Sequence, residues 1–494
     1  MKNLQLKFIV DPSIVRWFRI INQFERNQLA TKGELAKSNH VSERTIQTDV
    51  NKMKDYFSES VQFVSTKSGY SFQKERPVLF LKQKEQLLEN EILFELLGNV
   101  FYGELEDMTE LIDRFHLSEA TFRRYLKQIQ PVLEEYGLEL SLYPLDLKGE
   151  EANIRKFFKD FYYEGEMTPH TLVPPRDLHE LVQATFYDKF EYFSIGTGTS
   201  PAEFYYSLYI AIERVRQGKT IAIPQGLIER VIASENFRLM YSLKEAIQTN
   251  YQVALSEEEF CWLYLVTVAK RPLDRIDQEA VFCQELAIQG TLLPLTETYL
   301  KEYFPELQAT EAFTVLQAFF LSRVINHLIA PIQNKIMAET IEKMKQDSKE
   351  IYAKNNSFLV ASLSELKITD TYLPDIATSL TLLVRRLKER YLQDRKKIIF
   401  LLEGDLYVCQ SIRSRVLHYF GKRHDLFFMT IQALSDDFLA QEDIDLVVTN
   451  YSDYLSEYTV NTDYLLLKTV PDSQDWRLLF QKIEPQLSTL IGLN

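Results

Sequence analysis

The polar side chains between residues 42 and 52 are of types that contact nucleic acid. Arginine, lysine, asparagine and glutamine donate hydrogen bonds to base edges and phosphates, and serine and threonine hydroxyls serve either target. Ile46, Val50 and Met53 recur among them at helical spacing, which places the polar residues on the opposite face of one helix. The sequence therefore predicts a DNA-contacting face made of Ser42, Arg44, Thr45, Gln47, Thr48, Asn51 and Lys52.

The stretch that carries this face occurs twice. Residues 40–57 are matched 76 positions later by residues 116–133, and both copies begin with the pattern His-apolar-Ser-Glu-x-Thr. The serine of each copy can cap the following helix, and a capping-box pattern precedes each copy, at 31–34 and 107–110. Each copy is therefore interpreted as a helix-turn-helix in which His40 and His116 are structural. The exposed residues expected on the second recognition helix are Arg123, Arg124, Lys127 and Gln128.

A hairpin and a local excess of positive charge distinguish the first copy. Residues 61–64 and 70–72 alternate around a Thr-Lys-Ser-Gly turn, which predicts a wing with Lys67 at its tip against the phosphate backbone. Residues 1–70 hold 11 Lys and Arg against 7 Asp and Glu, whereas residues 71–160 hold 12 against 18. Because DNA affinity depends on neutralising phosphates, we expect the first copy to be the principal DNA reader. Solvated helix faces without a ligand remain the alternative interpretation of both copies.

The overall composition favours a cytoplasmic protein of several domains. A chain of 494 residues exceeds what one core usually organises, and its net charge of −14 suits a regulatory body held away from DNA. Three scattered cysteines give no metal or disulfide pattern, and the N-terminus has no signal-peptide run. Residues 312–332 are apolar but include polar and charged side chains, which favours a buried helix over a membrane span. No cofactor, metal or common catalytic motif is expected.

Periodicity and chain-breaking residues divide the sequence into five parts. Helical patterns dominate up to about residue 392, and strands then alternate with helices, which is typical of a small parallel α/β domain. The predicted fold is therefore multidomain and mainly α. The expected domains are a winged helix-turn-helix at 1–73, a second helix-turn-helix domain at 74–165, all-helical bundles at 166–271 and 272–392, and the α/β domain at 393–494.

This order of parts resembles the Mga/AtxA class of bacterial virulence regulators. In that class, two helix-turn-helix units precede two PTS regulation domains and a tail similar to an enzyme IIB of the sugar phosphotransferase system. The resemblance implies a transcriptional regulator rather than an enzyme. It also implies three partners, namely double-stranded promoter DNA, a second copy of the chain in a homodimer, and the phosphocarrier protein HPr with other PTS proteins.

Two stretches carry the resemblance to PTS regulation domains. Residues 207–214 are similar to the family pattern of a histidine, an apolar helix and Glu-Arg, but Ser207 stands where the histidine is expected. The other acceptor position of this bundle falls near Tyr264, and in the second bundle His327 keeps the histidine. Histidine is required because imidazole accepts a phosphoryl group near neutral pH and transfers it reversibly. The phosphorylation candidates are His327, His179 and His170, and each could instead be a structural side chain.

The tail departs from the enzyme IIB pattern. That activity requires a phosphocysteine at the end of the first strand, whereas residues 402–405 are Leu-Glu-Gly-Asp and Cys409 lies in the helix that follows. We therefore expect the fold without its phosphotransfer, serving docking or dimerisation. Two alternatives to a DNA-binding regulator are an RNA-binding antiterminator, which would begin with a small β-rich module, and a phosphotransferase component, which would need a reactive cysteine near 402–405.

Overall fold

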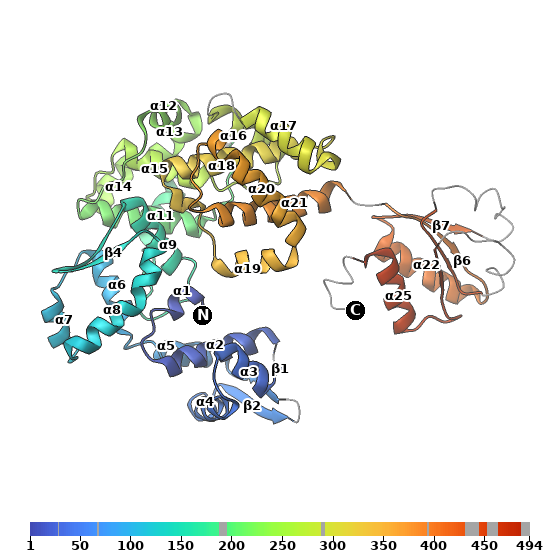
Figure 1. The fold of residues 1–494 in the computed structure, drawn as a ribbon, viewed down its shortest axis with the longest axis horizontal. Helices are drawn as coiled ribbons and strands as arrows, with labels where there is room; N and C mark the ends of the chain where they lie inside the picture. Colours follow the sequence, from blue (N-terminus) through green and yellow to red (C-terminus); the bar gives the residue numbers. More distant parts are fainter. Residues whose placement is uncertain are drawn as a thin grey trace. The chain divides into compact units, whose positions relative to one another are not determined.

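The computed structural model describes residues 1–27, 29–66, 69–186, 195–287, 292–392, 395–429, 444–451 and 463–485. The chain divides into two compact units, Met1–Leu383 and Val384–Asn494 (Figure 1). The first unit is largely helical with two small antiparallel sheets, and the second contains a four-stranded parallel sheet. This is the mainly α, multidomain fold that the sequence predicts.

The first helix-turn-helix carries the predicted wing. The two wing strands pair antiparallel with Phe63 opposite Phe72, and a short strand that the sequence did not indicate pairs with the second of them. Ile46, Val50 and Met53 are fully buried, as their helical spacing predicts. The elements are α2 (Pro12–Asn27), β1 (Leu29–Ala30), α3 (Lys32–Asn39), α4 (Glu43–Tyr56), β2 (Val61–Thr66) and β3 (Gly69–Lys74).

The first and second helix-turn-helix units exchange packing contacts. Phe80, on the helix after the wing, packs in the first core. In the other direction, Phe8 packs its ring against Phe157 and Phe161 of the second core, at centroid distances of 5.9 and 5.0 Å. The elements are α1 (Asn3–Leu6), α5 (Pro77–Gln86), α6 (Ile92–Tyr102), α7 (Met108–Arg114), α8 (Glu119–Glu134), β4 (Glu139–Leu142), β5 (Leu145–Lys148) and α9 (Glu151–Tyr162).

The middle of the chain contains helices and no strands among the residues that the structure describes. The helices up to Val268 form the first bundle region and include α10 (Arg176–Phe186), α11 (Pro201–Arg216), α12 (Gln225–Ala233), α13 (Glu235–Tyr241), α14 (Leu243–Tyr251) and α15 (Glu257–Val268). The second region contains α16 (Ile276–Glu285), α17 (Leu292–Tyr303), η2 (Pro305–Leu307), α18 (Ala312–Ile329), η3 (Pro331–Asn334), α19 (Ala338–Asp347), α20 (Lys349–Leu366) and α21 (Leu373–Tyr391). By length and hydropathy α18 could cross a membrane, but 67% of it is buried inside the protein, as a core helix would be.

A network of buried ion pairs joins the second helix-turn-helix to the first bundle. Arg155 on α9 donates to both carboxylate oxygens of Glu259 on α15, at 2.5 and 3.0 Å, and both side chains are almost fully buried. Arg214 on α11 pairs with Glu151 on α9 at 2.8 Å. Breaking such a pair leaves an uncompensated buried charge at a cost of about 3–5 kcal/mol. The network therefore opposes movement of α9 away from α11 and α15.

The tail has the predicted alternation of strands and helices. Its strands are all parallel in the order β7-β6-β8-β9, and Ile398, Ile399 and Phe400 of the central β6 are fully buried, as expected for a strand covered on both faces. The sequence predicts a strand at 426–431, of which residues 430 and 431 lie outside the described residues. The elements are β6 (Lys397–Leu401), α22 (Leu406–Phe420), β7 (Asp425–Met429), β8 (Leu446–Thr449), β9 (Tyr464–Leu466) and α25 (Ser473–Ile483).

The N-terminal segment docks against the second helix-turn-helix through a buried acid. The backbone N–H of Val10 donates to the Glu91 carboxylate at 3.1 Å, and the Gln5 side chain exchanges two hydrogen bonds with the backbone of Glu166, at 2.9 and 2.8 Å. Burial raises the pKa of Glu91 to about 7, and the nearby charge of Asp11 adds to the shift. The segment is therefore held by a group that ionises near neutral pH.

Replacing Glu91 by glutamine should stabilise the protein above neutral pH. The folded protein keeps the proton of Glu91 up to about pH 7, whereas the unfolded chain releases it near its ordinary pKa of 4.5. The free energy of unfolding therefore falls as the pH rises through this window, by at most roughly 3 kcal/mol. Thermal unfolding at pH 4 and pH 8 should show Glu91→Gln equal to the wild type at the lower pH and more stable at the higher. An equal effect at both pH values would contradict this, and exposed Glu89→Gln is the control.

Candidate nucleic-acid interface

The first recognition helix, α4, exposes one face and buries the other. Ile46, Val50 and Met53 lie against the core with no exposed surface. The polar residues of the predicted contact set project from the opposite side, away from the core. The exposed members of that set are Ser42, Arg44, Gln47, Thr48, Asn51 and Lys52, and Thr45 is partly exposed.

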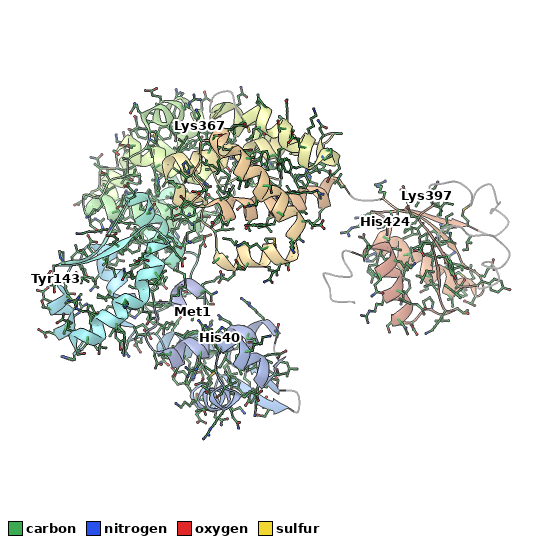
Figure 2. The ribbon with its side chains drawn as sticks, viewed as in Figure 1. Met1, His40, Tyr143, Lys367, Lys397 and His424 are labelled. Atoms are coloured by element: carbon green, nitrogen blue, oxygen red, sulfur yellow. The ribbon has the colours of Figure 1, made fainter. Side chains whose placement is uncertain are left out.

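The two sequence copies are also copies in geometry. The Ser42 hydroxyl accepts from the Thr45 N–H at 3.2 Å, and Ser118 accepts from Thr121 at the same distance. In both pairs the hydroxyl oxygens lie 2.9 Å apart. Ser42 and Thr45, both predicted DNA contacts, therefore also cap α4. His40, labelled in Figure 2, and His116 both have left-handed backbones in the turn, with φ of 54° and 52°.

A buried acid holds α4 against α2. The Asp49 carboxylate accepts from Arg16 through Nε at 2.8 Å and Nη2 at 3.3 Å, and Asp49 is almost fully buried. The hydrogen bond to this carboxylate raises the pKa of Arg16. An exposed carboxylate on a recognition helix would repel phosphate, so turning Asp49 inward both positions the helix and keeps the outer face favourable for DNA.

Two lysines that the sequence did not single out extend the basic surface. Lys32 at the start of α3 and Lys54 on α4 lie 5.6 and 5.7 Å from the centre of the Tyr70 ring on β3. Lys54 also donates to the Ser65 hydroxyl on β2 at 3.2 Å. Positive charge from α3 and α4 is thereby gathered beside the wing. Lys67, predicted at the wing tip, lies outside the described residues.

The second recognition helix, α8, offers fewer unpaired cations. Arg123 pairs with Glu119 one turn earlier at 2.7 Å, and the Arg124 guanidinium lies 5.4 Å from the centre of the Tyr125 ring. Arg123, Arg124 and Lys127 are all exposed, as expected. The internal pair leaves Arg124 and Lys127 as the cations most available to a phosphate.

Gln128 corrects the expectation for α8. Its side-chain amide donates to the carbonyl oxygens of Lys7 and Ile9, at 2.9 Å each. The prediction that Gln128 belongs to the reading face is therefore wrong, because the N-terminal segment binds this part of the helix. Only the tertiary structure brings a segment so distant in sequence to α8.

The three candidate acceptor histidines have different surroundings. His327 on α18 is partly exposed, and burial lowers its pKa, which favours the neutral imidazole that can accept a phosphoryl group. His179 on α10 stacks on the Tyr205 ring, with centroids 4.2 Å apart. His170 places Nε2 3.1 Å from the carbonyl oxygens of residues 88 and 89, so that this nitrogen is the protonated donor.

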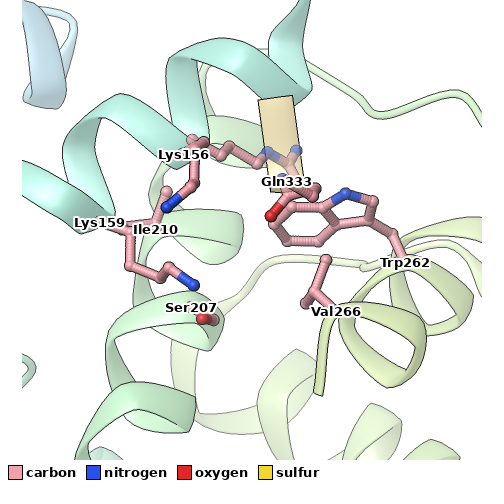
Figure 3. Close-up of a pocket in the computed structure, with 8 residues that line it drawn as sticks. Lys156, Lys159, Ser207, Ile210, Trp262, Val266 and Gln333 are labelled. Atoms are coloured by element: carbon pink, nitrogen blue, oxygen red, sulfur yellow. The ribbon is translucent and has the colours of Figure 1, made fainter. Parts of the chain in front are cut away.

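The two other acceptor positions are buried hydroxyls. Figure 3 shows Ser207 in a small recess with Lys156, Lys159 and Gln333. Ser207 is 6% exposed and donates to the carbonyl oxygen of Glu203 at 3.0 Å. Tyr264 is fully buried, with its hydroxyl 3.2 Å from that of Ser234. Burial keeps both hydroxyls out of reach of a carrier protein.

In the tail, a carboxylate lies in the loop after β6, where the resemblance to an enzyme IIB predicts a phosphocysteine. Asp405 caps α22 and accepts from the N–H groups of Tyr407 and Val408, at 2.9 and 3.1 Å. Burial raises the pKa of the Cys409 thiol, and the charges of Glu403 and Asp405 raise it further. The described loop therefore disfavours both a bound phosphate and a thiolate.

Comparison with known proteins bears on both the second helix-turn-helix and the whole chain. Residues 80–162 match the Mga helix-turn-helix domain. This span contains α8. The match therefore falls on the second copy, which the excess of acidic residues around it predicts to be the weaker DNA reader.

Similarity to two regulators extends over most of the chain. The capsule synthesis positive regulator AcpA of Bacillus anthracis is 21% identical over 462 residues, which cover 89% of this chain and 93% of that protein. AcpB of the same organism, also a capsule synthesis positive regulator, is 19% identical over 453 residues, covering 89% and 88%. A putative trans-acting regulator of Streptococcus pneumoniae serotype 4 is 24% identical over 142 residues, or 28% and 29% of the two chains. The chain is thus an Mga/AtxA-like regulator, with an Mga helix-turn-helix domain in residues 80–162.

Proposed function

We propose that this protein regulates transcription in the cytoplasm by binding double-stranded promoter DNA through both helix-turn-helix units. The observation that carries the proposal is α4, whose exposed face consists of base-reading and phosphate-binding side chains while its other face is buried. A helix of this kind fits the major groove, and the wing beside it fits the adjacent phosphate backbone. The names of AcpA and AcpB support positive regulation.

The two units are proposed to contribute unequally. α4 has the more varied hydrogen-bonding face, and Lys32 and Lys54 add positive charge beside it. α8 carries exposed Arg124 and Lys127 but lies in an acidic stretch. The match of the Mga domain to this second unit supports a DNA contact there as well. We infer that α4 reads bases and that α8 mainly binds phosphates.

Two sets of alanine substitutions test this division. Arg44→Ala, Gln47→Ala and Lys52→Ala together should weaken specific binding about 10- to 100-fold or more, since a base-reading pair contributes about 1–3 kcal/mol. Arg124→Ala and Lys127→Ala together should weaken binding to all sequences and lower the salt slope by roughly one unit per lost phosphate contact. Electrophoretic shift titrations across salt concentrations measure both.

The controls are Lys82→Ala and Arg176→Ala, which change exposed residues outside both recognition helices. Unchanged affinity and salt slope in the first set of variants would refute the role of α4.

The helical middle is proposed to act as two PTS regulation domains that tune DNA binding through histidine phosphorylation. His327 is the leading acceptor, because it is the one histidine that keeps the family position and because burial favours its neutral form. His179 and His170 are further candidates. The buried ion pairs between α9 and the first bundle give a physical connection between the regulatory and DNA-binding parts.

Phosphate mapping tests this regulation. Incubation of the full chain with phosphoenolpyruvate, enzyme I and HPr should place a phosphoryl group on His327, detected by mass spectrometry under non-acidic conditions. His327→Ala should lose that label, and His116→Ala, changed in the helix-turn-helix turn, should keep it. Absence of label from His327, His179 and His170 would remove phosphorylation from the proposal.

The tail is proposed to make the homodimer contact. A set of apolar side chains is exposed where the parallel strands end, and we call it the strand-end patch. The loops that carry it touch, since Asn450 exchanges two hydrogen bonds of 2.8 Å with the backbone of Glu403. An exposed apolar cluster of this kind is typical of an interaction surface. The patch consists of Tyr407 (82% exposed), Val470 (66%), Leu406 (65%) and Tyr451 (44%).

Sedimentation of matched variants tests the dimer. Leu406→Ser with Tyr407→Ser should weaken self-association at least tenfold, because it removes two large apolar side chains from the patch. Leu417→Ser is the control, since Leu417 is also exposed but lies about 16 Å further along α22. Equal sedimentation profiles for the wild type and the double variant would exclude the strand-end patch as the dimer contact.

A further inference from the structure

Arg323 on α18 is a partly buried guanidinium that no carboxylate of the described residues pairs with. Its Nε donates to the Ser322 hydroxyl at 3.2 Å, and its guanidinium lies 5.2 Å from the centre of the Phe319 ring. Three more deeply buried arginines in the same unit are each paired. Their partners are Glu259 for Arg155, Glu151 for Arg214, and Glu279 for Arg271.

The lack of a countercharge is energetically unfavourable. Burial alone lowers the pKa of Arg323 to about 10, and no charge among the described residues opposes the shift. Taking a cation out of water costs free energy that an ion pair normally offsets. A guanidinium retained in such a place is therefore suited to an anion that arrives from outside the chain.

His327 lies one helical turn from Arg323. Residues four apart on a helix are neighbours, with Cβ atoms roughly 5–6 Å apart, so that Phe319, Arg323 and His327 form one stripe along α18. Phe319 is buried at one end of the stripe, whereas His327 is partly exposed and Leu328 beside it is exposed at the other. The stripe therefore runs from the core to a surface that a donor can reach.

We propose that Arg323 is the counter-ion of a phosphoryl group carried by His327. The inference rests on the proposed function only in taking His327 as the acceptor. A lone pair of the His327 ring attacks the phosphorus of a phosphohistidine carrier, and the new N–P bond forms as the N–P bond of the carrier breaks. The carrier nitrogen leaves with the electron pair, and it gains a proton from solvent as the His327 ring loses one. Arg323 then binds the phosphoryl oxygens, for which the guanidinium fork is well shaped.

The site is connected to the second recognition helix by a short segment. The Asn334 side chain on η3 donates to the carbonyl oxygen of Arg323 at 3.1 Å, and Asn326 donates to Asn334 at 3.2 Å. The next residue, Lys335, pairs at 3.4 Å with Glu135, which directly follows α8. The segment that bonds to the backbone of the site therefore also contacts the residue after α8.

The test uses potassium phosphoramidate, which phosphorylates accessible imidazoles without a carrier protein. The full chain is treated, and the phosphorus-31 resonance that disappears in His327→Ala is followed against pH. A nearby cation stabilises the phosphoryl dianion, so this resonance should titrate about one pH unit lower in the wild type than in Arg323→Gln. Arg323→Lys should give an intermediate value, and Arg275→Gln, an exposed change in the same bundle, should match the wild type.

Each outcome separates this inference from the proposed regulation. The same titration in wild type and Arg323→Gln overturns it, even if HPr labels His327. An Arg323-dependent titration supports it, even if HPr does not label His327. No phosphoramidate label at His327 overturns it as well. Saturable binding of inorganic phosphate that depends on Arg323 and persists in His327→Ala would show a free-anion site and overturn the covalent one.

Discussion

Buried charge matched by buried countercharge is the constraint that joins the second helix-turn-helix to the first helical bundle. Arg155 and Glu259 lie on α9 and α15, and Arg214 and Glu151 cross from α11 to α9. Each partner would be costly to bury alone, so the helices that carry them must stay together. The N-terminal segment adds a second tie, because Gln5 and Val10 bond to the second helix-turn-helix. The second helix-turn-helix and the helices packed against it therefore resist separation within the first unit.

The duplicated helix-turn-helix illustrates how equal local structures acquire unequal surroundings. The caps at Ser42 and Ser118 have the same geometry, and both turns place a histidine in the left-handed region. The surroundings then differ. α4 has Lys32 and a wing beside it. In α8, Gln128 holds the N-terminal segment, and Glu135, which directly follows the helix, pairs with Lys335. The second copy thus also connects the N-terminal segment and the segment after η3 to the rest of the first unit.

Most of the fold could be predicted from local patterns. Apolar spacing located α4, the repeated pattern located α8, and alternation located β2 and β3. These signals are strong because burial of one face imposes a period on the sequence. β1 was missed, since two residues carry no period and pair only because β3 lies beside them. The same helical spacing predicted both faces of α4, because the residues between the buried ones must lie on the exposed side.

The sequence by itself determined most of the helices and strands and the two serine caps, because each depends on residues close together in the chain. Only the tertiary structure decided which polar residues are free to act. In the folded protein Asp49 points inward and Gln128 bonds to the distant N-terminal segment. Ser207 and Tyr264 are buried. Arg323, one helical turn from His327, has no carboxylate partner among the described residues. Spacing along a helix fixes the direction of a side chain. What that side chain meets is fixed by elements that pack from elsewhere in the chain, and no local pattern records them.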